Sequence, residues 1–236
     1  MDILGLGWLA PYSSQLLAGL WLTSILSVAS CAAGTFIGIC CGWIQGQNNR
    51  IGRLLATSYM EIFRNTPLLA QVFFCYFGLA GLGLRMSPIS AAMLALVLNC
   101  GAYCSEIFRA GFASIKVTQH EAAECLALSK LQTFIHVILP QVMRIVWVSL
   151  SGQFVLMILA TSIVSQISVD ELTSAASQVQ SMTFRSFELY VILAVGYFAI
   201  AMFVKLILHW IGVYYFGEPR KKPVTTTLGV ATEVQK

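Results

Sequence analysis

Residues 121–129 read Glu-Ala-Ala-Glu-Cys-Leu-Ala-Leu-Ser, and Ile138, Leu139 and Pro140 follow shortly after. This polar, helix-prone stretch interrupts a chain in which hydrophobic residues make up 58% and charged residues only 10%. A soluble domain of 236 residues cannot bury that much apolar surface, whereas about 20 apolar residues are enough to cross a bilayer. Such runs are helical in hydrocarbon, because each must satisfy its own backbone polar groups. The sequence therefore predicts an all-α polytopic membrane protein with one elaborated polar loop.

Apolar segments on both sides of this loop predict five transmembrane helices. The second is entered by an amphipathic lead-in from Leu54, and the five cover Leu16–Ile44, Thr66–Leu84, Ser87–Phe108, Ile145–Ile167 and Tyr190–Tyr214. The predicted organisation is an N-terminal segment (1–15), a transmembrane domain (16–214) that contains the polar loop at about 112–140, and a tail (215–236). Because five is odd, the two ends of the chain lie on opposite sides of the membrane.

Basic residues orient these helices, since cytoplasmic loops carry the excess of Lys and Arg. They gather in alternate connections: Arg50, Arg53 and Arg64; then Arg109, Lys116, Lys130 and Arg144; then Arg220, Lys221 and Lys222 in the tail. We expect an outside N-terminus, with the polar loop and the tail in the cytoplasm. Asp2 and the lack of a basic n-region argue against a signal peptide. The net charge of +4 reflects loops facing anionic lipid, and nothing in it indicates a nucleic-acid partner.

Cysteines, histidines and glycines offer little chemistry. We interpret the seven cysteines as small apolar residues, since most fall within predicted spans, and His120, His136 and His209 are isolated. We expect no metal, no cofactor and no catalytic residues, and no ATP binding because a Gly-x-x-x-x-Gly-Lys-Ser/Thr loop is missing. Every fourth residue from Gly34 to Gly46 is glycine, which predicts a close helix-packing surface. Its partner, within this chain or in a second subunit, is left open.

The polar loop resembles the EAA loop of ABC-importer permeases, through Glu121-Ala122-Ala123 and Ile138-Leu139-Pro140. Other stretches resemble the polar amino-acid subfamily of these permeases: Phe63–Gln71, Ala102–Gly111, Glu171–Thr173 and Thr183–Tyr190. Together they extend the resemblance over roughly residues 15–212.

The resemblance implies a type I importer permease that moves a polar amino acid, or a related solute such as an opine, into the cytoplasm. Implied partners are two ATPase subunits, an identical or homologous permease and an extracytoplasmic solute-binding protein, all at a bacterial inner membrane. The implied ATPase-docking residues are Glu121, Ala122, Ala123, Ala127, Ile138, Leu139 and Pro140.

Two positions depart from the family pattern. Ala127 stands where the family carries glycine, so a turn needing positive φ would cost about 1 kcal/mol. The alternatives are an ordinary helical turn or altered docking. In the segment Leu159–Ile163, Ala160 and Thr161 stand where the family usually has a charged pair. A different ligand explains this, as does a subunit that leaves the ligand site to its partner.

Polar residues inside apolar spans are functional candidates by default. Glu61 with Arg64, and Glu106 with Arg109, are three residues apart, and we expect each pair to form an ion pair at a helix end. Neutral donors and acceptors suit a zwitterionic solute, and the candidates for its path are Gln71, Asn99, Thr161, Ser162 and Gln166.

Within the loop, Glu121 is expected to open a helix, where its carboxylate favours the helix dipole, and Pro140 to end the helical segment. Two other functions remain as alternatives. A secondary transporter is disfavoured, because five crossings without an internal repeat are too few for the usual inverted design. A membrane anchor or assembly subunit explains the missing charges but not the elaborated loop.

Overall fold

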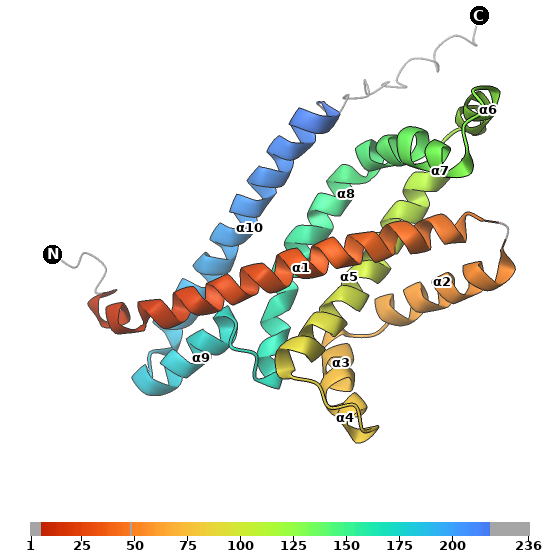
Figure 1. The fold of residues 1–236 in the computed structure, drawn as a ribbon. Coiled ribbons are helices and arrows are strands. Elements are labelled where there is room, and N and C mark those ends of the chain that lie inside the picture. Colours follow the sequence, from red (N-terminus) through yellow and green to blue (C-terminus); the bar gives the residue numbers. More distant parts are fainter. Residues whose placement is uncertain (1–5, 48, 218–236) are drawn as a thin grey trace, which may run out of the picture.

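The computed structural model describes residues 6–47 and 49–217, and each regular element in these ranges is a helix. Residues 1–5 and the predicted tail from 218 lie outside the described ranges. Four long helices dominate the molecule: α1 (Ser13–Gln45), α5 (Pro88–Ala113), α8 (Leu139–Ala160) and α10 (Ser186–Phe216) (Figure 1). With the helical turns that extend α1 and α8, four stretches are long and apolar enough to cross a membrane: Gly7–Gln45, Pro88–Ala113, Lys130–Ile167 and Ser186–Phe216.

The second predicted crossing is built differently from the other four. An amphipathic helix α2 (Arg50–Arg64) is followed by α3 (Leu68–Phe73), a π-helical turn (Phe74–Gly78) and α4 (Leu79–Gly81). Its apolar part, Leu68–Gly81, is a shorter apolar helix. It has fewer than the roughly 20 residues that a full crossing of the bilayer needs. The lead-in starts at Arg50 rather than Leu54, because the Asn49 side chain caps the helix by accepting from the Ile51 and Gly52 amides.

The chain breaks between α2 and α3 at Asn65-Thr66-Pro67, since a residue before proline is disfavoured in helix. The Gln71 side chain compensates: its Nε2 donates to the carbonyls of Phe63 (2.8 Å) and Thr66 (3.1 Å). These carbonyls would otherwise lack partners at the end of α2. Irregular backbone is tolerated at this position because a side chain from the next helix satisfies it.

The glycine ladder packs within this chain, which settles the alternative left open by the sequence. A Cβ at Gly34 would lie 2.7 Å from Cys100 Cβ, and one at Gly42 would lie 2.8 Å from Phe108 Cβ. Gly38 faces Cys104 in the same way. Only glycine lets α1 approach α5 this closely, so the two helices form one tightly packed pair. Gly46 lies beyond the end of α1 and takes no part.

Short helices lie at the two ends of this body. Helices α6 (Val117–Cys125) and α7 (Lys130–Gln132) project beyond the ends of α5 and α8, and α9 (Leu172–Thr183) lies at the opposite end (Figure 1). The expectation that Pro140 ends a helix is wrong: α7, a π-helical turn (Thr133–Ile138) and α8 run on continuously. Pro140 is the second residue of α8, and the π turn replaces the α turn whose carbonyl its ring would strike.

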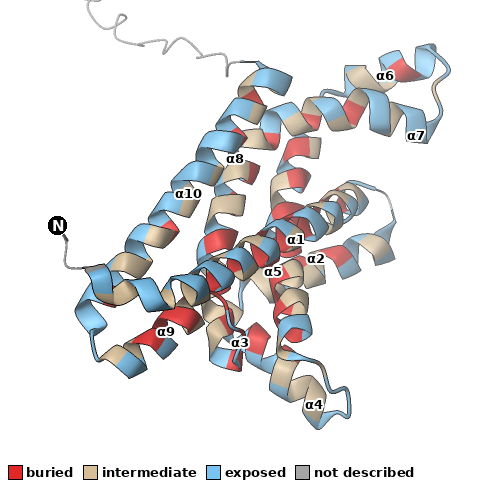
Figure 2. Ribbon diagram, turned by 60° about the vertical axis from the view of Figure 1, so that its left-hand side comes forward, coloured by how far each residue is buried: buried red, intermediate tan, exposed pale blue. Residues whose placement is uncertain are grey.

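Burial is uneven across the four long helices (Figure 2). The most buried is α5, whereas the buried residues of α10 are only Leu189, Tyr197, Leu208 and Gly212. Trp147 of α8 packs over Gly212 and donates its indole N–H to the Leu208 carbonyl (3.0 Å). An apolar helix attached along one stripe, with the rest exposed, is suited to contact with lipid.

Candidate functional site: the polar loop and the adjoining cavity

Helix α6 gives the polar loop (residues 112–140) its shape, and it starts earlier than the sequence indicated. It begins at Val117, after Lys116 in extended conformation. Glu121 is therefore the fifth residue of the helix, not its opening residue, and the predicted interaction with the helix dipole is wrong, because that effect falls off within the first turn. Glu121 and Ala122 point outward and are exposed, whereas Ala123 is buried. Because Glu121 is exposed on the outer side of α6, a partner can reach its carboxylate.

Ala127 ends α6 in a Schellman motif. Its φ of 52° is left-handed, its amide donates to the Glu124 carbonyl (2.9 Å), and the Leu128 amide donates to the Ala123 carbonyl (3.1 Å). The turn thus has the conformation that glycine favours, so of the two alternatives for Ala127 the ordinary helical turn is excluded. An alanine here carries a strain of about 1 kcal/mol that glycine would remove.

The loop is braced internally after this turn. Ser129 and Gln132 form a capping box at the start of α7, and Gln141 of α8 donates to Gln119 of α6 (3.1 Å). Ile138 is buried, Leu139 is partly buried and Pro140 is exposed. In contrast, three large apolar side chains on the outside are at least two-thirds exposed: Val117 69%, Leu126 74% and Leu131 67%. A preformed loop with an exposed apolar surface is typical of a docking site.

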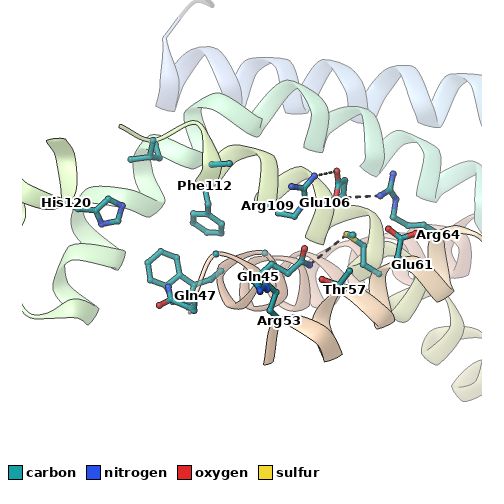
Figure 3. A pocket seen from close by; sticks show the side chains of 16 residues that line it. Gln45, Gln47, Arg53, Thr57, Glu61, Arg64, Glu106, Arg109, Phe112 and His120 are labelled. Atoms are coloured by element: carbon teal, nitrogen blue, oxygen red, sulfur yellow. Dashed lines mark hydrogen bonds and ion pairs between the residues drawn. The ribbon is translucent and has the colours of Figure 1, made fainter. Parts of the chain in front are cut away.

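A cavity of about 690 Å³ adjoins the loop, between the ends of α1 and α5, α2 and α6. Figure 3 shows its charged wall, where Arg109 donates twice to Glu106 (Nε–Oε2 2.9 Å, Nη2–Oε1 2.6 Å). The predicted ion pair between Glu106 and Arg109 is present. The prediction of an ion pair between Glu61 and Arg64 is wrong. Arg64 turns to Glu106 (3.6 Å), and Glu61 accepts from the Asn65 amide (2.7 Å). Because α2 lies beside α5, the inter-helix contact replaces the local one.

The residues proposed for a solute path fall into two groups. Asn99 donates to Gln71 (3.0 Å), and both are nearly buried. Thr161 is buried and donates to the Ile158 carbonyl (2.7 Å). Ser162 is partly exposed and Gln166 exposed, on a 3-10 segment (Thr161–Ile167) that packs against α3 and α5. The Ser162 hydroxyl also donates to a backbone carbonyl, that of Leu159 (2.7 Å). Burial therefore separates the two groups: Gln71, Asn99 and Thr161 are buried, whereas Ser162 and Gln166 are accessible.

Sequence reasoning missed a buried carboxylate at the far end of the molecule. Glu171 is fully buried at the start of α9. Its Oε1 accepts from the Thr173 and Ser174 amides (2.8 and 3.0 Å), and its Oε2 accepts from Tyr197 of α10 (2.6 Å) and Thr23 of α1 (3.3 Å). The sequence did contain a sign of this role: Glu171 directly precedes a helix-prone run, where a carboxylate can cap the helix. It was overlooked because Glu171 was considered only as part of the family's last extracellular loop.

Comparison with known proteins identifies the fold. The family described as "Binding-protein-dependent transport system inner membrane component" matches residues 34–215. The chain belongs to this family. It is 34% identical over 200 residues to the glutamine transport system permease protein GlnP of Escherichia coli (strain K12), covering 84% of this chain and 91% of the relative. The nopaline transport system permease protein NocM of Agrobacterium fabrum is 33% identical, over 80% and 83% of the two chains.

A solved structure carries the same fold. A chain of "an amino acid ABC transporter with histidines" superposes with a TM-score of 0.78 at 31% identity, over 87% of this chain and 96% of that one. The predicted permease fold and family are confirmed. This inner membrane component is a multi-pass transport subunit, not an enzyme, and its family implies separate ATPase and binding-protein partners.

Proposed function

We propose that this permease carries a polar amino acid, or a related solute of the opine type, into the cytoplasm, and that its polar loop docks an ATPase subunit. The glutamine and nopaline systems of the two relatives support this solute class. In the proposed assembly two ATPase subunits serve two permease chains, identical or homologous. The N-terminus lies outside, and the polar loop and the tail lie in the cytoplasm.

The exposed apolar surface of the loop is the observation that carries this proposal. Val117, Leu126 and Leu131 are exposed on α6, α7 and the turn between them, which project beyond the ends of α5 and α8 (Figure 1). The buried Ala123, the Schellman motif and the capping box fix the shape of this surface before any partner arrives, which lowers the cost of ordering it on binding. Glu121 adds one negative charge at its edge.

The solute path proposed here uses neutral groups. Ser162 and Gln166 offer a hydroxyl and an amide, and they follow Ala160 and Thr161, where the family usually has a charged pair. A zwitterion needs donors and acceptors but no net charge on the wall, so these groups suit a solute without a charged side chain. A partner permease that supplies the charged contacts remains the alternative for a heterodimer.

A purification from native membranes tests the docking role. The tagged full chain is compared with Glu121→Lys and with Glu188→Lys, an exposed carboxylate near α9, at the opposite end of the molecule from the loop. We expect the wild type and Glu188→Lys to recover an ATPase, and Glu121→Lys to reach the membrane but lose the ATPase and uptake. An ATPase retained by Glu121→Lys would contradict the docking role. No ATPase with the wild type would favour an anchor subunit.

A further inference from the structure

Three aromatic rings join the polar loop to the membrane-embedded body. Trp43 lies near the end of α1, Phe112 in the last turn of α5, at the point where the polar loop begins, and Phe134 in the π turn of the loop. Ring centroids are 4.4 Å apart for Trp43–Phe134, 5.4 Å for Trp43–Phe112 and 5.9 Å for Phe112–Phe134. Each ring contacts the other two, so Phe134 lies against both long helices at once. We name these three rings the aromatic joint.

The elements on both sides of the aromatic joint are stiff. On the loop side, the Gln141–Gln119 bond, the capping box and the Schellman motif tie α6, α7 and the start of α8 into one unit. On the membrane side, Gly42 packs directly on Phe108, and Phe108 stacks at 6.2 Å on Phe112. A displacement of the loop is therefore passed on at the joint instead of being absorbed within either part.

The aromatic joint also borders the charged cavity. Trp43 and Phe112 line it, together with His120 of α6 and the ion-paired Arg109 and Glu106 (Figure 3). Phe134 does not line the cavity itself, but it contacts Trp43 and Phe112, which do. Close-packed rings suit this task, because each aromatic pair prefers a particular relative geometry and a displaced ring therefore pushes on its neighbours.

We propose that the aromatic joint transmits ATPase-driven displacement of the polar loop to the α1–α5 pair and to the charged cavity. Phe134 acts as a positioning residue: it touches neither solute nor nucleotide, and it sets how far α1 and α5 follow the loop. The inference rests on the proposed docking function. Dispersion contacts weaken steeply once a gap opens, so removing the ring uncouples the loop from the α1–α5 pair while both keep their structure.

The test uses the whole complex with its ATPase and reads the cavity directly. A Thr57→Cys substitution in the cavity wall is labelled with a maleimide in the nucleotide-free state and after trapping with ATP and vanadate, with the unsubstituted chain as background. We expect trapping to change the labelling rate by about fivefold or more, the lower end of typical allosteric coupling. Phe134→Ala abolishes that change while ATPase recovery and hydrolysis persist, and Phe134→Tyr restores it.

Two further variants keep the result decisive. Phe36→Ala removes a ring that is 70% exposed on α1 and should leave the nucleotide-dependent change intact. Phe112→Leu weakens the joint away from the docking surface and should abolish the change even if Phe134→Ala loses the ATPase. A nucleotide-dependent change that survives both Phe134→Ala and Phe112→Leu overturns the inference, as does its absence in the wild-type complex. Loss of the ATPase from the wild type would instead refute the docking function.

Discussion

The two ends of the molecule hold their short helices by different forces. At one end, α9 is fixed by the buried Glu171 carboxylate, which accepts from two amides, Tyr197 and Thr23. At the other end, the loop that contains α6 meets the body through the aromatic joint of Trp43, Phe112 and Phe134. A fully satisfied polar network in a low dielectric is rigid, whereas ring contacts can shift together without breaking a hydrogen bond. From this contrast we expect α9 to be the fixed end and the polar loop to be the moving end.

Glu171→Ala should break the fixed end most severely. It removes the acceptor of four hydrogen bonds and leaves buried donors unsatisfied, at a cost of about 3 kcal/mol or more. Thermal unfolding of the purified chain in detergent measures the loss. Glu171→Gln, which keeps the shape and one acceptor oxygen, should cost clearly less. If both variants unfold at the same temperature as the wild type, the polar network does not fix α9.

Tyr197→Phe sharpens the comparison by deleting one hydroxyl group of the same network, which also shares a hydrogen bond with Thr173 Oγ1 (2.9 Å). The phenol donates to Glu171 at 2.6 Å, and a hydrogen bond to a charged group contributes about 2 kcal/mol. The same unfolding measurement should show a smaller shift than for Glu171→Ala. Tyr190→Phe, on the exposed part of the same helix, is the matched control and should change little. Equal effects at the two tyrosines would rule out a specific contribution from the Tyr197 hydroxyl group.

Ala127→Gly should have the smallest effect, in the opposite direction, at the moving end. Glycine relieves the left-handed strain at φ 52° and should stabilise the end of α6 by about 1 kcal/mol. Hydrogen exchange of the α6 amides should slow accordingly. Ala122→Gly is the same chemical change inside the helix and should accelerate exchange, since glycine costs about 1 kcal/mol there. Faster exchange in Ala127→Gly would show that the turn is not strained.

The sequence was sufficient for the fold class because hydrophobic length and family motifs both act over many residues. The glycine spacing predicted a close-packed face of α1. The spacing along one helix does not indicate which helix packs against it, and the structure shows that it is α5, through Cys100, Cys104 and Phe108. Pro140 misled because the π turn before it accommodates the ring. Rules for single residues predict local geometry, but they do not predict a neighbouring turn that accommodates the unfavourable residue.

The candidate site was predicted less completely. Gln71 and Asn99 were singled out as polar residues within spans, yet their amides bond to each other and to the broken end of α2. Arg64 was assigned to Glu61, three residues away, but long-range packing gave it Glu106. In each case the residue was correctly singled out as unusual, and its partner depended on a contact between helices.

The exposure of the polar loop gives this membrane protein a built-in chemical reporter. Cys125 is exposed on α6, whereas Cys31, Cys75, Cys100 and Cys104 are buried. Cys40 is exposed and Cys41 half-buried, but both belong to the apolar α1, whose outer face we expect to meet lipid. A thiol reagent that cannot enter the bilayer meets Cys125 only from the side on which the loop lies. Labelling of Cys125 in the native chain therefore reports on which side of the membrane the loop lies. It also reports whether a partner covers the docking surface, without any engineered cysteine.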